Sequence, residues 1–287
     1  METLTTIADV RAWRRGLGGS LGFVPTMGAL HEGHLTLARH ARQENDHLAA
    51  SIFVNPLQFA ANEDLDRYPR DLEGDSAKLA EAGVDALFFP QVEEVYPQGF
   101  TTKVEVHGPL TSVLEGVARP GHFAGVTTVV SKLFFSVQPT RAYFGMKDAQ
   151  QLLVIAKFVR DLDIDVQVMP VPTVREPDGM AMSSRNRYLA PAERQAASAI
   201  SAGLREAEAR FAAGERDAAA LRGVIAATLE REPLLRAEYI SCAELSTLRE
   251  LERVDEAALL SLAVRVGVTR LIDNAWLGVS GGAVPLP

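Results

Sequence analysis

The stretch LGFVPTMGALHEGHL, residues 21–35, decides the fold that this sequence predicts. Residues 21–25 form an apolar run that is typical of a buried strand, and a Thr-Met-Gly turn follows. Apolar residues at helical spacing then predict a helix from about His34. A strand that passes through a tight turn into a helix indicates a β–α unit of an α/β domain.

The same alternation continues on the C-terminal side of this stretch. Further strands are predicted at 49–54, 85–89, 141–145 and 164–171, and helices at 71–82, at 125–137 and after Asp148, the last with Leu152, Ile155, Ala156 and Val159 on one face. Strands with little polar alternation, joined by helices, are typical of a parallel sheet that is buried on both faces. We therefore predict a doubly wound α/β domain, in which ligands bind beyond the carboxyl ends of the strands.

The segment PTVREPDGMAMSSRNRY, residues 172–188, interrupts this pattern with Pro, Asp-Gly and paired serines. We place a domain boundary there, between domains 1–175 and 176–287. Beyond it, helical spacing groups Ile200, Leu204, Ala207 and Phe211, and then Leu221, Ile225 and Leu229, with strands near 237–242, 262–267 and 269–273. A smaller α/β domain is expected.

Composition limits the classes of function. Hydrophobic residues make up 47% of the chain and charged residues 23%, as in ordinary globular proteins. The net charge of −8 argues against nucleic acid as a partner, although a local site can still be basic enough for a nucleotide. The single cysteine, Cys242, excludes an intrachain disulfide and fits a reducing compartment. With neither a signal-peptide pattern nor a membrane-spanning apolar run, we expect a cytoplasmic protein with no membrane partner.

The His-x-Gly-His element at residues 31–34 is the strongest chemical signal. It lies at a strand-to-helix crossing, where the N–H groups of a helix N-terminus suit phosphate. Gly33 lets the backbone approach a ligand closely, and His31 and His34 can donate hydrogen bonds to phosphate oxygens. Two alternatives are polar surface residues and a metal-binding pair. Zinc is disfavoured because the element lacks the spacing His-Glu-x-x-His.

A second signal, FGMKDAQQ at residues 144–151, also lies where a predicted strand meets a helix. Gly145 allows close approach, Lys147 can place a positive charge on phosphate, and Asp148 can cap the helix or bind a ribose hydroxyl. The alternative is a capped helix with a solvated lysine.

Two more segments carry candidate binding groups. MSSRN, residues 182–186, offers two hydroxyls and a guanidinium as a polyphosphate clamp, and FVNPLQF, residues 53–59, offers amides for the carboxylate or hydroxyls of a small substrate. An ordinary loop and a strand-ending turn are the alternatives. Because three of the four signals suit a triphosphate and lie at strand ends or at the hinge, their coincidence favours a nucleotide site.

These segments, with RYPR at 67–70 and ARPGHFAGV at 118–126, resemble the ordered motifs of the pantothenate synthetase (pantoate–β-alanine ligase) family. The resemblance is dense over residues 1–190 and continues more loosely to RLIDN at 270–274. His-x-Gly-His alone indicates only the wider nucleotidyltransferase superfamily, which includes class I aminoacyl-tRNA synthetases. The combination with FVNPLQF and RPGHFAGV is much more specific.

The resemblance implies a Rossmann-like N-terminal domain, a C-terminal α/β lid domain and a homodimer. It implies ATP-dependent ligation of pantoate and β-alanine to pantothenate through a pantoyl-adenylate, with Mg²⁺ as cofactor and with AMP and pyrophosphate released. Carried over by position, the catalytic residues are His34 (a proton donor), His31, Lys147 and Arg185. The ATP-binding residues are Met27, Gly28, Ala29, Leu30, His31, Glu32, Gly33, His34, Gly145, Met146, Lys147, Asp148, Val174, Met182, Ser183, Ser184 and Arg185. The substrate-binding residues are Asn55, Gln58, Arg119, His122 and Gln151. Mg²⁺ is expected to bind chiefly through phosphates and water, with Asp75 as a candidate protein ligand.

The sequence departs from the family pattern at Met146, where a glutamate is common, and we expect restoration of Glu to change ATP affinity only modestly. Two other functions are compatible with the motifs. A plain nucleotidyltransferase would stop at an adenylylated product, and a non-catalytic sensor would bind ATP without turnover. An RNA-binding role is disfavoured by the net charge of −8.

Overall fold

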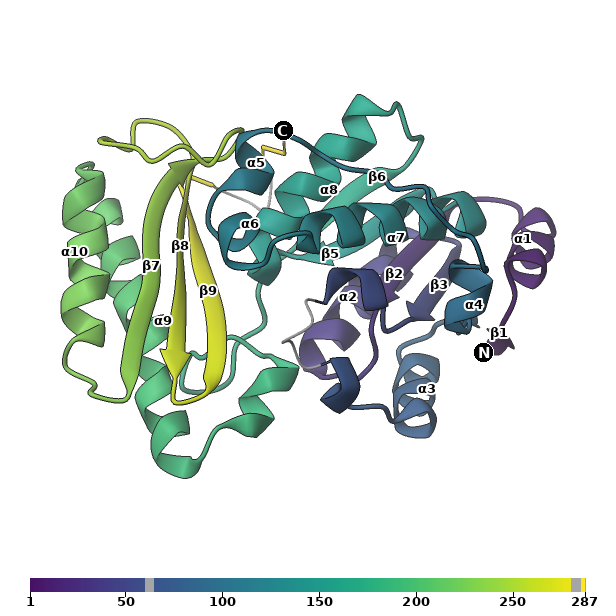
Figure 1. Cartoon of the computed structure of the whole chain (residues 1–287), viewed down its shortest axis with the longest axis horizontal. Coiled ribbons are helices and arrows are strands. Elements are labelled where there is room, and N and C mark those ends of the chain that lie inside the picture. Colours follow the sequence, from purple (N-terminus) through teal and green to yellow (C-terminus); the bar gives the residue numbers. More distant parts are fainter. Residues whose placement is uncertain (60–64, 280–284, 287) are drawn as a thin grey trace. The chain divides into compact units, whose positions relative to one another are not determined.

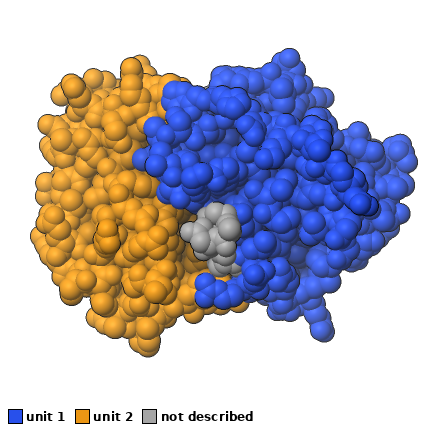
Figure 2. All heavy atoms as spheres, viewed as in Figure 1, with its two compact units in different colours: residues 1–145, 150–171 blue, residues 146–149, 172–287 orange. Residues whose placement is uncertain are grey.

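The computed structural model describes residues 1–59, 65–279 and 285–286. The chain forms two compact units (Figure 2). The N-terminal unit comprises Met1–Gly145 and Gln150–Val171, and the C-terminal unit comprises Met146–Ala149 and Pro172–Pro287. The short segment Met146–Ala149 is therefore separated in sequence from the rest of its unit by residues 150–171.

A six-stranded parallel sheet forms the centre of the N-terminal unit (Figure 1). Its strands are β1 (Glu2–Leu4), β2 (Leu21–Thr26), β3 (His47–Ile52), β4 (Ala86–Phe88), β5 (Arg141–Gly145) and β6 (Gln167–Val171), in the order β1-β4-β3-β2-β5-β6. Each neighbouring pair runs parallel. The predicted Rossmann-like sheet is confirmed.

Helices connect these strands: α1 (Ile7–Arg15), α2 (Glu32–Glu44), α3 (Leu72–Glu81), α4 (Val92–Val95), α5 (Pro109–Ser112), α6 (Glu115–Ala118), α7 (His122–Val137) and α8 (Ala149–Asp161), with short 3₁₀ turns η1 (Pro56–Gln58), η2 (Leu65–Arg67) and η3 (Met146–Asp148). The apolar face predicted for α8 is buried, because Leu152, Ile155 and Ala156 are each less than a tenth exposed. Burial of such faces, rather than helix propensity, supplies most of the stability of helices in proteins.

The strand order positions the site. After β2 the chain moves outward through β3 and β4, and it then returns to β5 on the opposite side of β2. The order of strands thus reverses between β2 and β5. In open α/β sheets ligands bind in the crevice outside the carboxyl ends of the strands at such a reversal. Residues 27–34 follow β2 at this point, and β5 ends there at Gly145.

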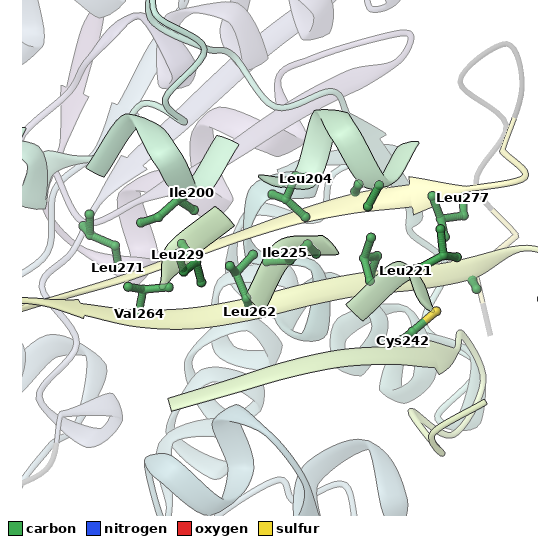
Figure 3. Close-up of a cluster of buried hydrophobic side chains, with 14 of the residues drawn as sticks. Ile200, Leu204, Leu221, Ile225, Leu229, Cys242, Leu262, Val264, Leu271 and Leu277 are labelled. Atoms are coloured by element: carbon green, nitrogen blue, oxygen red, sulfur yellow. The ribbon is translucent and has the colours of Figure 1, made fainter. Parts of the chain in front are cut away.

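The C-terminal unit contains an antiparallel sheet of β7 (Leu235–Glu244), β8 (Ala258–Val266) and β9 (Thr269–Leu277). Helices α9 (Pro191–Ala212) and α10 (Ala218–Leu229) pack against it, and the turn η4 (Ser184–Tyr188) precedes them. Figure 3 shows the shared core, a cluster of buried apolar side chains that includes Leu204, Ile225 and Leu262. The predicted smaller domain with two helices and three strands is confirmed as a separate sheet.

Element ends differ from the predictions in several places. The helix expected from about His34 begins at Glu32, since His31 caps it, and the helix expected at 125–137 begins at His122. The strand expected at 49–54 lies at His47–Ile52. Elements β1 and α1 were not predicted, because three residues carry too little pattern and α1 buries only Val10. No helix in the described part of the chain is long and apolar enough to cross a lipid bilayer.

Candidate active site

The turn between β2 and α2 is built around Thr26 and Gly28. The Thr26 hydroxyl donates to the Ser51 carbonyl oxygen at 2.7 Å and accepts the Gly28 N–H at 3.2 Å. Gly28 has φ +82°, and a Cβ there would lie 3.1 Å from the Ile52 side chain and 3.2 Å from the Asp75 carboxylate. A side chain would be both strained and crowded at this position, so glycine is required.

Asp75, from α3, holds the next two residues of this turn. Its carboxylate is 1% exposed and accepts the Ala29 N–H at 2.7 Å and the Leu30 N–H at 2.9 Å. Ala29 adopts φ +54°, a left-handed conformation that a non-glycine residue keeps only when its surroundings enforce it. Lys78 lies 3.4 Å from the same carboxylate and donates to the Leu30 carbonyl oxygen. The geometry therefore makes Asp75 the anchor of the turn, while its candidacy as a metal ligand stays a prediction.

His31 and His34 cap helix α2 reciprocally. The His31 Nδ1 accepts the Gly33 N–H at 3.2 Å, and the His34 Nδ1 accepts the His31 N–H at 3.4 Å. The two rings lie 4.2 Å apart between centroids. Because a nitrogen that accepts a hydrogen bond cannot carry the proton, each neutral ring carries its proton on Nε2. Both imidazoles are thus prepared as Nε2–H donors.

This arrangement changes the expected role of the helix N-terminus. The amides were expected to face phosphate directly, but the N–H groups of Gly28, Ala29, Leu30, His31 and Gly33 all donate to side chains of the protein. These five amides are therefore occupied within the protein, and direct contact of the helix N-terminus with phosphate stays a prediction. The exposed Glu32 side chain, also among the predicted ATP contacts, is paired with Arg39.

Asn55 and Gln58 form a second cluster of the N-terminal unit, beyond the carboxyl end of β3. Asn55 is 1% exposed, and its amide nitrogen donates to Gln58 Oε1 and to the Gly125 carbonyl oxygen, both at 3.1 Å. Its Oδ1 accepts from the Tyr96 hydroxyl at 2.8 Å, and burial raises the pKa of that phenol, which stays protonated. The Gln58 Nε2 lies 3.0 Å from Met27 Sδ. This cluster is therefore joined to the turn that carries the histidines.

Arg119 and His122 hold the backbone of Gln58. The His122 Nδ1 lies 2.9 Å from the Gln58 carbonyl oxygen, and the Arg119 guanidinium lies 3.0 Å from His122 Nε2. Arg119 also donates to the Gln58 carbonyl oxygen at 3.4 Å. Gly125 lets α7 approach closely, since a Cβ there would lie 2.2 Å from the Leu57 carbonyl oxygen. Both residues predicted to bind substrate therefore lie next to Gln58.

The two glutamines at the start of α8 differ in role. Gln150 is buried, accepts the Glu115 N–H at 3.0 Å, and donates to the Leu110 and Val113 carbonyl oxygens. It ties the segment around α5 and α6 to α8. Gln151, the predicted pantoate ligand, is only half-buried.

In the C-terminal unit, the predicted ATP-binding residues occupy two segments. Turn η3 carries Lys147, whose ammonium lies 3.4 Å from Asp148. Residues 174–182 form a hairpin that is closed by a hydrogen bond from the Met182 N–H to the Val174 carbonyl oxygen at 3.0 Å. Ser183 follows it and caps η4, because its hydroxyl accepts the Arg185 N–H. Hydrogen bonds from Arg194 hold the pKa of the Asp178 carboxyl, at the hairpin tip, below its usual value.

The structure thus groups the predicted residues of each unit, and it adds others. Asp75, Tyr96 and Gln150 position the N-terminal cluster, and sequence reasoning gave none of them that role. A single sequence offers no signal for such roles, because each partner is distant along the chain.

Comparison with known proteins agrees with the geometry. The model of the family described as pantoate-beta-alanine ligase matches residues 2–276. The chain is 57% identical to pantothenate synthetase of Roseiflexus sp. (strain RS-1) over 277 residues, which is 96% of this chain and 99% of that protein. It is 55% identical to pantothenate synthetase of Moorella thermoacetica over 98% of this chain and 100% of that one.

Solved structures give the same result. Pantothenate synthetase from Thermus thermophilus superposes with a TM-score of 0.92 at 50% identity, covering 96% of this chain and 99% of that one. Pantoate-beta-alanine ligase from Francisella tularensis, complexed with beta-gamma ATP and beta-alanine, has a TM-score of 0.79 at 35% identity, covering 99% of this chain and 100% of that one. The sheet order, the paired histidines and these likenesses together establish that the chain belongs to the pantoate–β-alanine ligase family.

Proposed function

We propose that this chain is an ATP-dependent ligase that joins pantoate to β-alanine and releases pantothenate, AMP and pyrophosphate. Family membership across residues 2–276 supports the reaction. The observation that carries the chemistry is the reciprocal cap of His31 and His34 beyond the carboxyl end of β2. It presents two N–H donors where a nucleotide binds in this class of sheet.

A carboxylate must be activated before an amine can displace its oxygen. In the first step, a pantoate carboxylate oxygen bonds to the α-phosphorus of ATP, and the bond to the bridging oxygen breaks, so pyrophosphate leaves with the electron pair. Negative charge builds on the phosphate oxygens, and fixed donors are most effective there because they need no reorganisation. We assign this role to the His31 and His34 Nε2–H groups. We keep His34 as the donor whose loss should cost most.

Pantoate is held, in this proposal, by Gln58 and Gln151. The support for Gln58 is its fixed position, because Asn55 bonds its side chain and His122 bonds its backbone carbonyl oxygen. A site that holds a reactant within a fraction of an ångström of the attack geometry lowers the barrier by orders of magnitude. In the second step the β-alanine amine bonds to the acyl carbon of the pantoyl-adenylate, AMP leaves, and the amine loses a proton.

We assign further ATP contacts to the C-terminal unit through Lys147, Ser183 and Arg185, on the strength of the sequence motifs. Mg²⁺ would neutralise phosphate charge. The described residues contain no group of three His, Cys, Asp or Glu side chains suited to a metal, and both Asp75 oxygens accept amide hydrogens. We therefore propose that Mg²⁺ enters with ATP, held mostly by phosphate oxygens and water. A homodimer is proposed from the same resemblance.

The test is incubation of the protein with ATP, Mg²⁺ and pantoate, with and without β-alanine, with AMP, pyrophosphate and pantothenate followed by mass spectrometry. The ligase requires pantothenate and AMP to rise in equal amounts only when both substrates are present. Pyrophosphate released to an adenylylated product that ignores β-alanine would instead identify a plain nucleotidyltransferase. ATP bound without turnover would identify a sensor.

A further inference from the structure

Strand β9 carries two adjacent buried polar residues in its middle, between the buried apolar residues Leu271 and Ala275. Asp273 is 3% exposed and Asn274 is 4% exposed. Buried polar groups are costly unless they are bonded, so each needs a partner that accounts for it. They belong to the RLIDN motif, to which the proposed function assigns no role.

Asn274 bonds the backbone of turn η3. Its amide nitrogen donates to the Lys147 carbonyl oxygen at 2.7 Å and to the Met146 carbonyl oxygen at 3.1 Å. The Trp276 indole, two residues further on the same face of β9, also points to the Met146 carbonyl oxygen, at 3.4 Å. The backbone at Lys147 is thus attached to a strand that is itself paired along its length with β8.

Asp273 holds the hairpin of residues 174–182 in the same way. Successive side chains of a strand point to opposite faces, and Asp273 bonds Arg175 with both oxygens, at 2.7 and 3.0 Å. Arg175 in turn donates to the Gly179 and Asn274 carbonyl oxygens at 3.1 and 3.2 Å. This ion pair fixes the hairpin that leads into Ser183 and Arg185. Two neighbouring residues of β9 therefore hold both segments of the C-terminal unit that carry predicted ATP contacts.

We propose that Asn274 is a positioning residue for ATP activation, which acts by fixing the backbone of Lys147. The proposal rests on the proposed function of Lys147 as a phosphate contact. A lysine has a long flexible stem, so the place of its charge depends on where its backbone is anchored. Displacement by about 1 Å is enough to reduce a rate by orders of magnitude. Asn274 itself touches no reacting atom in this assignment.

The experiment is a double-mutant cycle between Asn274→Ala and Lys147→Ala in the full-length enzyme. Pantoate-dependent pyrophosphate release at varied ATP concentration gives kcat/KM for ATP. The overall reaction at varied β-alanine concentration gives KM for β-alanine, and thermal unfolding shows whether each variant is folded. Asn274→Asp keeps the shape of the side chain but replaces the NH₂ group, and as a carboxylate it cannot donate to a carbonyl oxygen. Asn274→Ser replaces Asn274→Ala if the latter yields too little folded protein.

Ser261→Ala is the matched control. Ser261 is the cross-strand partner of Asn274 on β8 and is 7% exposed, and its hydroxyl has no hydrogen-bond partner among the described residues. Its removal changes the same face of the sheet without touching the η3 backbone. We expect this variant to keep wild-type kcat/KM for ATP.

Asn274→Ala is expected to lower kcat/KM for ATP about tenfold, as for one or two net hydrogen bonds, and to leave KM for β-alanine unchanged. In the Lys147→Ala background, Asn274→Ala should lower kcat/KM for ATP by less than about a further twofold, since the side chain that Asn274 positions is gone. A full additional tenfold loss there, or wild-type kinetics in the Asn274 single variants, overturns the proposal. Wild-type activity of Lys147→Ala would instead show that the assigned role of Lys147 is wrong.

Discussion

Replacement of Asp75 by asparagine tests whether this residue organises the turn between β2 and α2. Asparagine keeps the shape of the side chain, but its single oxygen can accept only one of the two N–H groups, from Ala29 and Leu30, that the carboxylate now accepts. Its NH₂ group would then face the other amide hydrogen. The variant therefore removes one charge-assisted bond and leaves one buried donor unsatisfied.

The magnitude follows from these two losses. A hydrogen bond to a charged group contributes about 1.5–3 kcal/mol, and an unsatisfied buried donor costs about 1–3 kcal/mol. The Lys78 side chain is 41% exposed, so its ion pair adds at most about 1 kcal/mol. We expect a loss of about 3–5 kcal/mol in unfolding free energy and a melting temperature lower by about 6–15 °C. Because Ala29 relaxes and shifts His31, kcat/KM for ATP should fall about 100-fold.

The assays are thermal unfolding and pantoate-dependent pyrophosphate release, measured over ranges of ATP and of Mg²⁺ concentration. Asp71→Asn is the control, because Asp71 caps the same helix by accepting the Gly74 N–H at 3.0 Å but does not contact the turn. It should change stability by less than about 0.5 kcal/mol and keep its kinetics, because asparagine caps a helix about as well as aspartate. The reasoning is refuted if Asp75→Asn retains wild-type stability and changes only the Mg²⁺ concentration required, since that result would identify a metal ligand.

Three other changes probe the remaining features. His34→Ala should lower pantoyl-adenylate formation, measured by pantoate-dependent ATP–pyrophosphate exchange, by about 10²–10³-fold. His34→Gln can still cap the helix, so it should restore stability without activity, and near-normal exchange in either variant would contradict the assignment. Gly125→Ala should push α7 away from the Leu57 carbonyl oxygen and lower the free energy of unfolding, measured with denaturant, by about 1–3 kcal/mol or more. It should also raise KM for pantoate more than KM for ATP, and an unchanged pantoate KM would disprove the link to Gln58. Burial raises the pKa of the Cys242 thiol to about 11. The neutral thiol therefore stabilises the fold below its unfolded pKa of about 8.5, and this contribution is lost as the pH rises toward 11, so the melting temperature should fall over this range. Cys242→Ala should make that fall less steep, and an unaltered slope would count against this reasoning.

The sequence predicted those elements whose signal is local. The apolar run at residues 141–145 is strand β5 as expected, and the spacing of Leu152, Ile155 and Ala156 identified the buried face of α8. These patterns succeed because side chains alternate every two residues in a strand and return every 3.6 residues in a helix. Strand β1 escaped prediction, because its three residues are held only by pairing with β4, far along the chain.

The site divides in the same way. The His-x-Gly-His motif marked the turn between β2 and α2 as a candidate nucleotide site. The reciprocal cap of the two rings was not foreseen, since it depends on backbone angles that only the completed turn fixes. From the sequence, Asp75 was only a candidate ligand for Mg²⁺. Its bonds to the Ala29 and Leu30 amides, which the sequence did not indicate, place it under the turn, and its candidacy as a metal ligand stays a prediction. The sequence indicated the candidate site residues but gave little indication of the contacts that position them.

By itself, then, the sequence determined the α/β class, the run of strands and helices, the nucleotide motif and the resemblance to a ligase family. The tertiary structure decided which side chains meet. The Asp75–Ala29 bond joins residues 46 apart, the His122–Gln58 contact joins residues 64 apart, and the Asn274–Lys147 bond joins residues 127 apart. Local periodicity carries no information about such pairs, because they form only when the sheet order brings distant segments together and burial makes each unbonded polar group costly.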